Sequence, residues 1–197
     1  MVTVTSLREA INIVYFGDRQ PTAAQRVAAH FAVFMLVLAV FGYAADFAPA
    51  PNWTIFGGVL AAVLALTVVY VLIAYLQSCG IPVFRRSPPL LSLWARLVGL
   101  TAIVFVVSWL AFVHGAGAAL ARVGGELSVR EVPVRREFAA YSRSCHHRIL
   151  ATDPAASGSL RFCLTPAQYD KLEKQRSVVL TGWSSQQGFL VEGWHLP

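Results

Sequence analysis

Leu97-Val-Gly-Leu-Thr-Ala-Ile-Val-Phe-Val-Val-Ser-Trp-Leu110 is the stretch that decides the fold of this chain. It lies within a run of 25 residues, between Arg96 and Arg122, that carries no formal charge. A helix rises about 1.5 Å per residue, so about 20 apolar residues cross the roughly 30 Å of hydrocarbon in a bilayer. The run is therefore long enough to span a membrane as a helix.

Two further uncharged runs lie upstream of this stretch. The interval between Arg26 and Asp46 holds 19 residues, and the interval between Asp46 and Arg85 holds 38. An open sheet cannot cross lipid, because its unpaired backbone groups find no hydrogen-bond partners there. We therefore predict three transmembrane α-helices within residues 27–121, at about residues 27–47, 54–76 and 97–120.

The composition of the whole chain agrees with a membrane protein. Its 197 residues are 56% hydrophobic and 13% charged, against about 25% charged residues in an ordinary soluble domain. These values exclude a disordered chain, a fibrous repeat and a large multidomain enzyme. The net charge of +6 would suggest nucleic acid binding in a soluble protein. Here the basic residues lie mostly at the ends of apolar runs, so we expect the lipid bilayer as a partner and no nucleic acid.

Arginines in the short loops predict the orientation. The tail of residues 1–26 holds three arginines, the loop between the second and third runs holds three, and residues 46–53 hold none. The positive-inside rule then places the tail and the second loop in the cytoplasm. Three crossings leave residues 122–197 on the other side. The 14 arginines against 2 lysines favour a bacterial inner (plasma) membrane, with the C-terminal segment in the periplasm.

The cysteines give a second indication of sidedness. Cys79 lies at the predicted cytoplasmic end of the second span, whereas Cys145 and Cys163 both lie in the predicted periplasmic segment. An oxidising compartment favours pairing of the latter two. A bond between them would close a 19-residue loop and stabilise a small domain by about 3 kcal/mol.

Two local patterns accompany the predicted spans. Leu7, Ile11 and Val14 recur at helical spacing, which predicts an amphipathic helix in the cytoplasmic interface; a plain juxtamembrane tail is the alternative. Thr22 is expected to cap the first span. Small residues four apart in the second span predict close helix packing within the bundle: Gly58, Ala61, Ala62 and Ala65.

The composition changes after the third run. Residues 122–197 hold 17 of the 26 charged residues and several turn signals. We predict a small, mainly antiparallel β (α+β) domain here, closed by the disulfide. Its expected elements are a strand at 127–134 confined to an edge by Pro133, a hairpin at 147–152 and 160–164, a short helix at 165–174 capped by Thr165, and a second hairpin at 178–183 and 189–194.

Two kinds of catalytic or metal site were weighed for this domain. Cys145, His146 and His147 resemble zinc ligands, with Cys163, His195 and His114 as further candidates. Adjacent histidines on a strand point to opposite faces, and a disulfide would use both thiolates. Ser184, His195 and Asp170 include the residue types of a hydrolase triad, but the chain has no Gly-x-Ser-x-Gly elbow. We therefore expect no metal, no cofactor and no enzymatic activity; a metal-dependent enzyme is the alternative.

Transport is the remaining class of activity. Ionisable residues inside a membrane are costly and usually mark ion or substrate paths. The predicted spans carry few polar residues, namely Thr67, Thr101, Ser108 and His114. Three such helices do not line a pore alone, so transport would require an oligomeric channel.

Binding to another protein is the function that remains. Trp183, Phe189 and Trp194 are the candidate contact residues, with the core of the domain itself as their alternative role. The most concrete form is an immunity protein that neutralises a toxin acting on the membrane or in the periplasm, because blocking a toxin requires shape and apolar contact and no catalysis. The alternative is an accessory subunit of an envelope complex or transporter.

Overall fold

The computed structural model describes residues 20–78, 89–138, 145–153, 155–171 and 177–195, together with residues 12, 14 and 16. The chain divides into two compact units, Met1–Val37 and Leu38–Pro197. The predicted interfacial helix around Leu7 to Val14 lies largely outside the described residues. The same holds for Cys79 and the loop that follows it.

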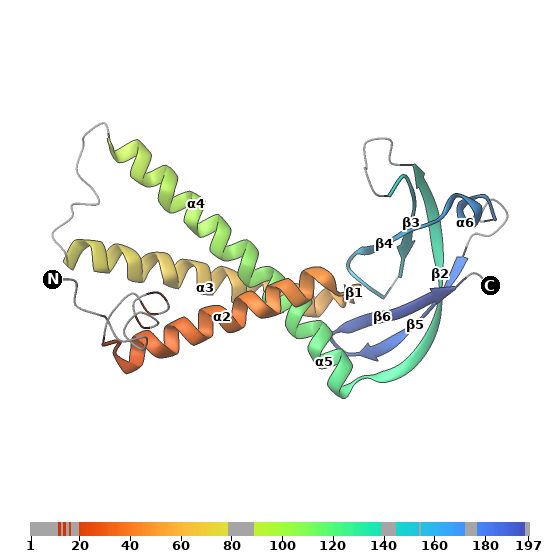
Figure 1. Cartoon of the computed structure of the whole chain (residues 1–197), viewed down its shortest axis with the longest axis horizontal. Helices are drawn as coiled ribbons and strands as arrows, with labels where there is room; N and C mark the ends of the chain where they lie inside the picture. The colour runs from red at the N-terminus through yellow and green to blue at the C-terminus, as the bar shows by residue number, and fades with distance from the viewer. Residues whose placement is uncertain are drawn as a thin grey trace, which may run out of the picture. The chain divides into compact units, whose positions relative to one another are not determined.

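Three helical stretches are long and apolar enough to cross a membrane, as predicted. They are Ala23–Ala44, Pro51–Tyr75 and Leu97–Gly124. The first coincides with helix α2 (Ala23–Ala44), and the second lies within α3 (Pro51–Ser78). The third runs through α4 (Pro89–Trp109), the π-helix η1 (Leu110–Ala116) and α5 (Gly117–Gly124), which follow one another without a break (Figure 1).

Helix α2 begins at a cap that the sequence predicts. The Thr22 hydroxyl accepts a hydrogen bond from the Gln25 backbone at 3.3 Å, and the Gln25 side chain accepts one from the Thr22 backbone at 2.7 Å. This reciprocal pair is a capping box. The helix ends at Ala44, three residues earlier than the predicted span, because Phe47 begins a strand.

Helix α3 packs chiefly against α4. Ala61 and Ala65 on α3 are 0% and 2% exposed. A Cβ atom on Gly57 would meet the Val113 side chain at 2.7 Å. Close packing at small residues is therefore present at Ala61 and Ala65, as predicted, and at Gly57, whereas Gly58 and Ala62 are only half-buried. The Thr67 and Thr101 hydroxyls donate to carbonyls of their own helices.

The π-helix lies where two helices touch through their backbones. A Cβ atom on Gly115 would collide with the carbonyl oxygen of Leu38, near the end of α2. A Cβ on Gly42 would in turn collide with the backbone nitrogen of Gly115. Trp53 donates from its indole nitrogen to the Val113 carbonyl at 3.0 Å, in the same π-helical segment. Glycine at both crossing positions permits this approach.

The strands within the described residues form one six-stranded antiparallel sheet in the order β1-β6-β5-β2-β3-β4. Its elements are β1 (Phe47–Pro49), β2 (Glu126–Phe138), β3 (His147–Thr152), β4 (Ser159–Cys163), the short helix α6 (Pro166–Lys171), β5 (Ser177–Ser185) and β6 (Gly188–His195). Both predicted hairpins are present, as β3–β4 and β5–β6. Thr165 caps α6 as predicted, through its hydroxyl and the Gln168 backbone.

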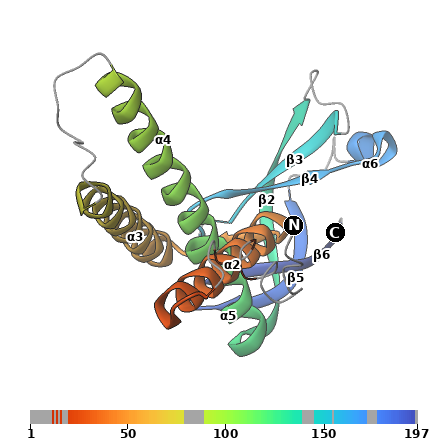
Figure 2. The ribbon, with the colours of Figure 1, turned by 60° about the vertical axis from the view of Figure 1, so that its left-hand side comes forward.

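Strand β2 was predicted at an edge; in the sheet order it is an interior strand, although within the described residues its first part, 126–133, pairs with β5 alone. It lies between β5 and β3 and belongs to both halves of the curved sheet (Figure 2). Residues Glu126–Pro133 pair with β5, and Val134–Phe138 pair with β3. Pro133, which has no backbone N–H, lies where β2 changes partner. A central strand tolerates the proline here because the residue does not need to pair on both sides.

Strand β1 comes from the segment between the first two spans, which the sequence treats as a loop. Phe47 pairs with Leu190 and Pro49 with Gly188, which makes β1 the neighbour of β6. The Val191 backbone donates to the Asp46 carbonyl at 2.9 Å and continues the contact. The link between two spans is thus part of the C-terminal sheet.

Two hydrophobic clusters hold this unit together. The larger lies inside the curved sheet and includes Val132, Ile149, Leu180 and Phe189, each at most 2% exposed. The smaller joins α5 to the sheet through Phe47, Ala118, Ala121 and Leu190.

Cys145 and Cys163 lie at disulfide-bonding distance, with their Cα atoms 5.5 Å apart. The pair joins the start of β3 to the end of β4, as the sequence predicts. It therefore closes the hairpin at the end away from its turn.

Candidate functional site

An exposed apolar face lies on β2 where it leaves α5. Side chains alternate along a strand, and Val132 points into the core at 2% exposure. Leu127 and Val129 lie on the opposite face, where they are 70% and 68% exposed. Their partners on β5 are Trp183 and Thr181. We call these four residues the exposed face.

Leu127 and Val129 stand apart from the rest of the sheet. Every other large hydrophobic side chain found exposed in the described part of the chain belongs to a helical segment, where lipid is the expected surrounding. The uncovered side of an antiparallel sheet is normally polar. Two neighbouring exposed apolar side chains on such a side make this surface the candidate site for contact with another molecule.

The edge of β2 beside this face is open in the described structure. Residues 126–132 pair with β5 on one side, while pairing with β3 on the other side begins only at Val134. An unpaired strand edge offers backbone donors and acceptors to an added strand. The exposed face and the open edge therefore adjoin on the same seven residues.

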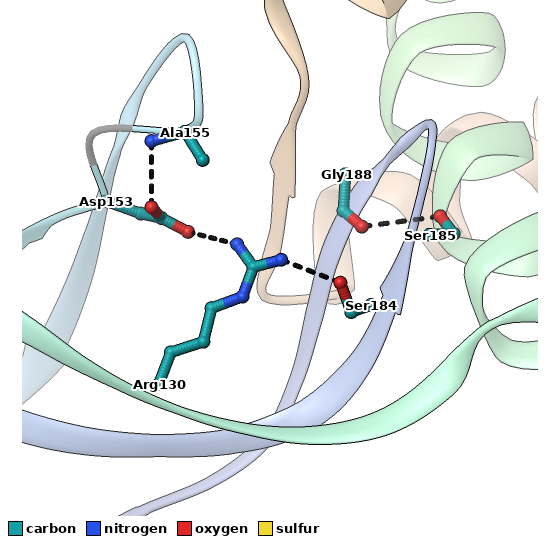
Figure 3. Close-up of polar contacts among 6 residues, drawn as sticks. All are labelled: Arg130, Asp153, Ala155, Ser184, Ser185 and Gly188. Atoms are coloured by element: carbon teal, nitrogen blue, oxygen red, sulfur yellow. Dashed lines mark hydrogen bonds and ion pairs between the residues drawn. The ribbon is translucent and has the colours of Figure 1, made fainter.

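Arg130 fixes β2 from the core side of the same segment. Figure 3 shows its guanidinium between the Asp153 carboxylate and the Ser184 hydroxyl, and it donates to each at 2.6 Å. The second Asp153 oxygen accepts from the Ala155 backbone at 2.9 Å. The guanidinium also lies over the Phe189 ring, 4.7 Å from its centroid.

This network joins three parts of the sheet. Arg130 is on β2, Ser184 is on β5, and Asp153 begins the turn between β3 and β4. The Asp153 side chain is 7% exposed and the Arg130 side chain 30%. A hydrogen-bonded ion pair with one buried member orders the groups that it joins. The face carried by β2 is thus held on a rigid support.

The smaller hydrophobic cluster contacts the exposed face at Trp183. Trp183 packs against it, beside Ala118 and Ala121 of α5. Gly125 connects α5 to β2. A Cβ atom at this position would lie 2.8 Å from the Ser184 carbonyl oxygen, so glycine is required there. The end of α5 and strand β5 therefore meet in a close backbone contact.

A small cavity of about 140 Å³ lies between β1, η1 and the β3–β4 turn. His114 borders it, with the Trp109 ring 5.1 Å and the Phe47 ring 6.5 Å away. Ser157, on the opposite wall, donates to the Pro49 carbonyl at 3.0 Å and hydrogen-bonds the Thr54 hydroxyl at 2.6 Å. The hydroxyls thus fasten the turn to β1. The remaining space suits an apolar group of about the size of a benzene ring.

Two carboxyl groups outside the spans have shifted pKa values. The hydrogen bond from Arg148, 2.6 Å long, lowers the pKa of Glu137, directly across the β2–β3 pair. Partial burial raises the pKa of Asp46, between α2 and β1. Glu137 forms an ion pair across two strands of the sheet, whereas Asp46 lies just beyond the end of α2.

The aromatic residues expected to contact a partner lie in different places. Phe189 is 1% exposed in the larger cluster, and Trp194 packs on Phe162 with ring centroids 5.8 Å apart. Both side chains pack in or against the hydrophobic core of the sheet, which was the alternative to a role in partner contact. Trp183 is half-buried and belongs to the exposed face. The structure therefore brings one of the three to a surface where a partner could reach it.

The candidate catalytic and metal residues are not assembled. Ser184 pairs with Phe189 and His195 with Val179, which separates the serine and histidine by five residues, or about 17 Å, along the hairpin. Within the described residues, no group of three or more His, Cys, Asp or Glu side chains is arranged to hold a metal ion. Cys145 and Cys163 are paired with each other.

A signal for the exposed face is present in the sequence but was not used. In the stretch 127–134, apolar residues occupy 127 and 129 and then 132 and 134. The alternation changes phase between Val129 and Val132. A regular strand cannot turn both pairs toward one core, so one pair had to be exposed.

Comparison of the chain with protein-family models, with curated proteins and with solved structures finds no match.

Proposed function

We propose that this chain is a non-catalytic membrane protein that binds a protein partner through the exposed face and the open edge of β2. The observation that carries the proposal is the exposure of Leu127 and Val129, at 70% and 68%, on the side of β2 that faces away from the core. Burial of both side chains by a partner would contribute about 3 to 5 kcal/mol of apolar transfer energy.

The proposed binding mode combines strand addition with apolar contact. An extended segment of the partner would pair with residues 126–132 and place its own apolar side chains beside Leu127 and Val129. The Arg130 network keeps the strand ordered before the partner arrives, which lowers the entropic cost of binding.

The proposed location is a bacterial inner membrane, with the N-terminus in the cytoplasm and the sheet in the periplasm. The arginine distribution supports this orientation. The pairing of β1 with β6 adds a constraint, because it requires the segment between the first two spans and the C-terminal sheet to share one side. A topology with three crossings meets that constraint.

The most concrete form of the proposal is an immunity protein against a toxin that acts on the membrane or in the periplasm. A rigid apolar face can block a toxin without performing chemistry, and a membrane anchor keeps it where such a toxin acts. Cells expressing this chain should survive the product of a toxin gene encoded beside its own gene.

The test uses a pair of variants matched in charge. Leu127→Asp with Val129→Asp adds two negative charges to the exposed face. Ser159→Asp with Arg161→Ser makes the same net change at two exposed positions on β4. We expect the first variant to lose protection and to weaken binding of the purified toxin at least about tenfold, the equivalent of about 1.4 kcal/mol. The second should behave as wild type.

The other outcomes are equally informative. Protection that survives the Leu127 and Val129 substitutions would contradict the proposed face. If deletion of the gene dissociates an envelope complex in cells that meet no toxin, the chain is instead an accessory subunit.

A further inference from the structure

A concave surface lies beside Arg122 of α5, at the end of the first predicted span. It has a volume of about 490 Å³ and is bordered by the last turn of α2, by Asp46, by Arg122 and by β6. Phe41 and Ala44 form its wall on α2, and Leu190 and Glu192 form its wall on β6. We call it the interfacial groove. The proposed protein partner does not use it.

The lengths of the spans place this groove at the membrane surface. Helix α2 has 22 residues, so it extends about 33 Å, close to the roughly 30 Å of hydrocarbon. Ala44 then lies near the hydrocarbon boundary and Asp46 just beyond it. The third span has 28 residues, about 42 Å, so its last turns with Arg122 pass into the headgroup layer.

The two ends of the groove differ in polarity. Phe41 is 38% exposed on the membrane side, where an acyl chain can lie against it. At the other end the Arg122 side chain is 63% exposed, and its guanidinium lies 3.3 Å from the Glu192 carboxylate. An apolar wall that leads to a charged end matches the outline of a phospholipid.

The charges at the polar end distinguish one class of lipid. Arg122 has donors free to hold a phosphate while it keeps Glu192 as a neighbour. No cationic side chain in the described structure forms an ion pair with Asp46. Partial burial raises the pKa of that carboxyl, so a cation beside it would relieve an existing cost. Two carboxylates beside one arginine disfavour an anionic lipid without an amine.

We propose that the interfacial groove binds a phospholipid whose headgroup carries a primary amine, with its phosphate at Arg122, its ammonium at Asp46 and an acyl chain along Phe41. Phosphatidylethanolamine is the simplest lipid of this class. The shared chemistry is a phosphate ester two carbons from an amine, which soluble phosphoethanolamine also has.

The test measures lipid retained by the purified full-length chain in detergent, by native mass spectrometry. Phosphatidylethanolamine and phosphatidylglycerol of equal acyl length are supplied in equal amounts. We expect retention of phosphatidylethanolamine to exceed that of phosphatidylglycerol at least about tenfold. Asp46→Asn and Arg122→Gln should each remove most of this preference, whereas Asp46→Glu should keep it.

Arg161→Gln serves as the control for loss of an exposed arginine, because Arg161 lies on β4 away from the groove. Equal retention of the two lipids, or an unchanged preference in Asp46→Asn and Arg122→Gln, would overturn the proposal. Displacement by soluble phosphoethanolamine at the lipid's own concentration would overturn the part assigned to the acyl chain. Unaltered thermal melting of the variants shows that the exposed substitutions leave the fold intact.

Discussion

At the scale of single residues, Arg130 and Asp153 determine how firmly the exposed face is held. Asp153 is almost fully buried, and both of its oxygens accept hydrogen bonds, one from Arg130 and one from the Ala155 backbone. Removal of such a carboxylate leaves a positive charge and a backbone donor without their acceptors. The cost of unmade hydrogen bonds then exceeds the modest net value of the bonds themselves.

Asp153→Ala should lower the free energy of unfolding by about 2 to 3 kcal/mol. This loss in free energy of unfolding is smaller than the loss expected for a fully buried ion pair, because the Arg130 side chain is 30% exposed and water can reach it. Thermal or urea unfolding of the detergent-solubilised chain, followed by circular dichroism of the sheet, measures the change. A loss below about 0.5 kcal/mol would show that the network does not support β2.

The residue scale also shows where sequence reasoning succeeds and where it fails. Thr22 and Thr165 are recognised as caps because the capping signal is local. The pairing of Cys145 with Cys163 follows from their number and predicted location. The Arg130–Asp153 pair joins positions 23 residues apart across the sheet. Charge alone does not indicate which of many arginines meets a given carboxylate.

At the scale of elements, α2 and η1 cross so closely that their backbones are in contact. Gly115 faces the Leu38 carbonyl and Gly42 faces the Gly115 backbone, with no space for a side chain at either position. In lipid, where helices gain nothing from burial of apolar surface, such backbone approach supplies much of the attraction. The π-helix around Gly115 is a local widening of a kind often found at functional positions.

Gly115→Ala should destabilise the helix bundle by about 1 to 3 kcal/mol, because its methyl group collides with a backbone carbonyl that cannot yield as a side chain would. Gly99→Ala is the matched control in the same helical stretch. A Cβ atom at Gly99 has no neighbour within 4 Å, so alanine there should be neutral or slightly stabilising. Unfolding in mixed micelles compares the two. Equal stability of both variants would contradict the described crossing.

Elements with a strong local pattern are predicted well from this sequence, and those made by distant pairing are not. The three spans follow from uncharged length, and the two hairpins follow from alternation around turn residues. Strand β1 has three residues and no pattern of its own, and it exists only because β6 pairs with it. Pro133 was correctly seen as incompatible with full pairing. The sequence does not show, however, that β2 changes partner at that point.

At the scale of the whole molecule, the spans and the sheet are connected in more than one way. The third span continues into β2 through Gly125, and the segment between the first two spans joins the sheet as β1. The Ser157 hydrogen bonds fasten the β3–β4 turn to the same segment. A sheet joined only through α5 could rotate about that single connection, whereas these contacts also hold it at β1.

A cysteine pair tests whether β1 and β6 are neighbours, the contact that requires the two segments to share one side. Phe47→Cys with Leu190→Cys places two thiols at directly paired positions, where Cβ atoms lie about 5 Å apart. Phe47→Cys with His195→Cys is the control, with the second thiol about 17 Å further along β6. Membranes from cells are oxidised, digested and searched for linked peptides by mass spectrometry. We predict a linked peptide for positions 47 and 190 and none for positions 47 and 195; no link at 47 and 190, or equal links in both variants, would contradict the account.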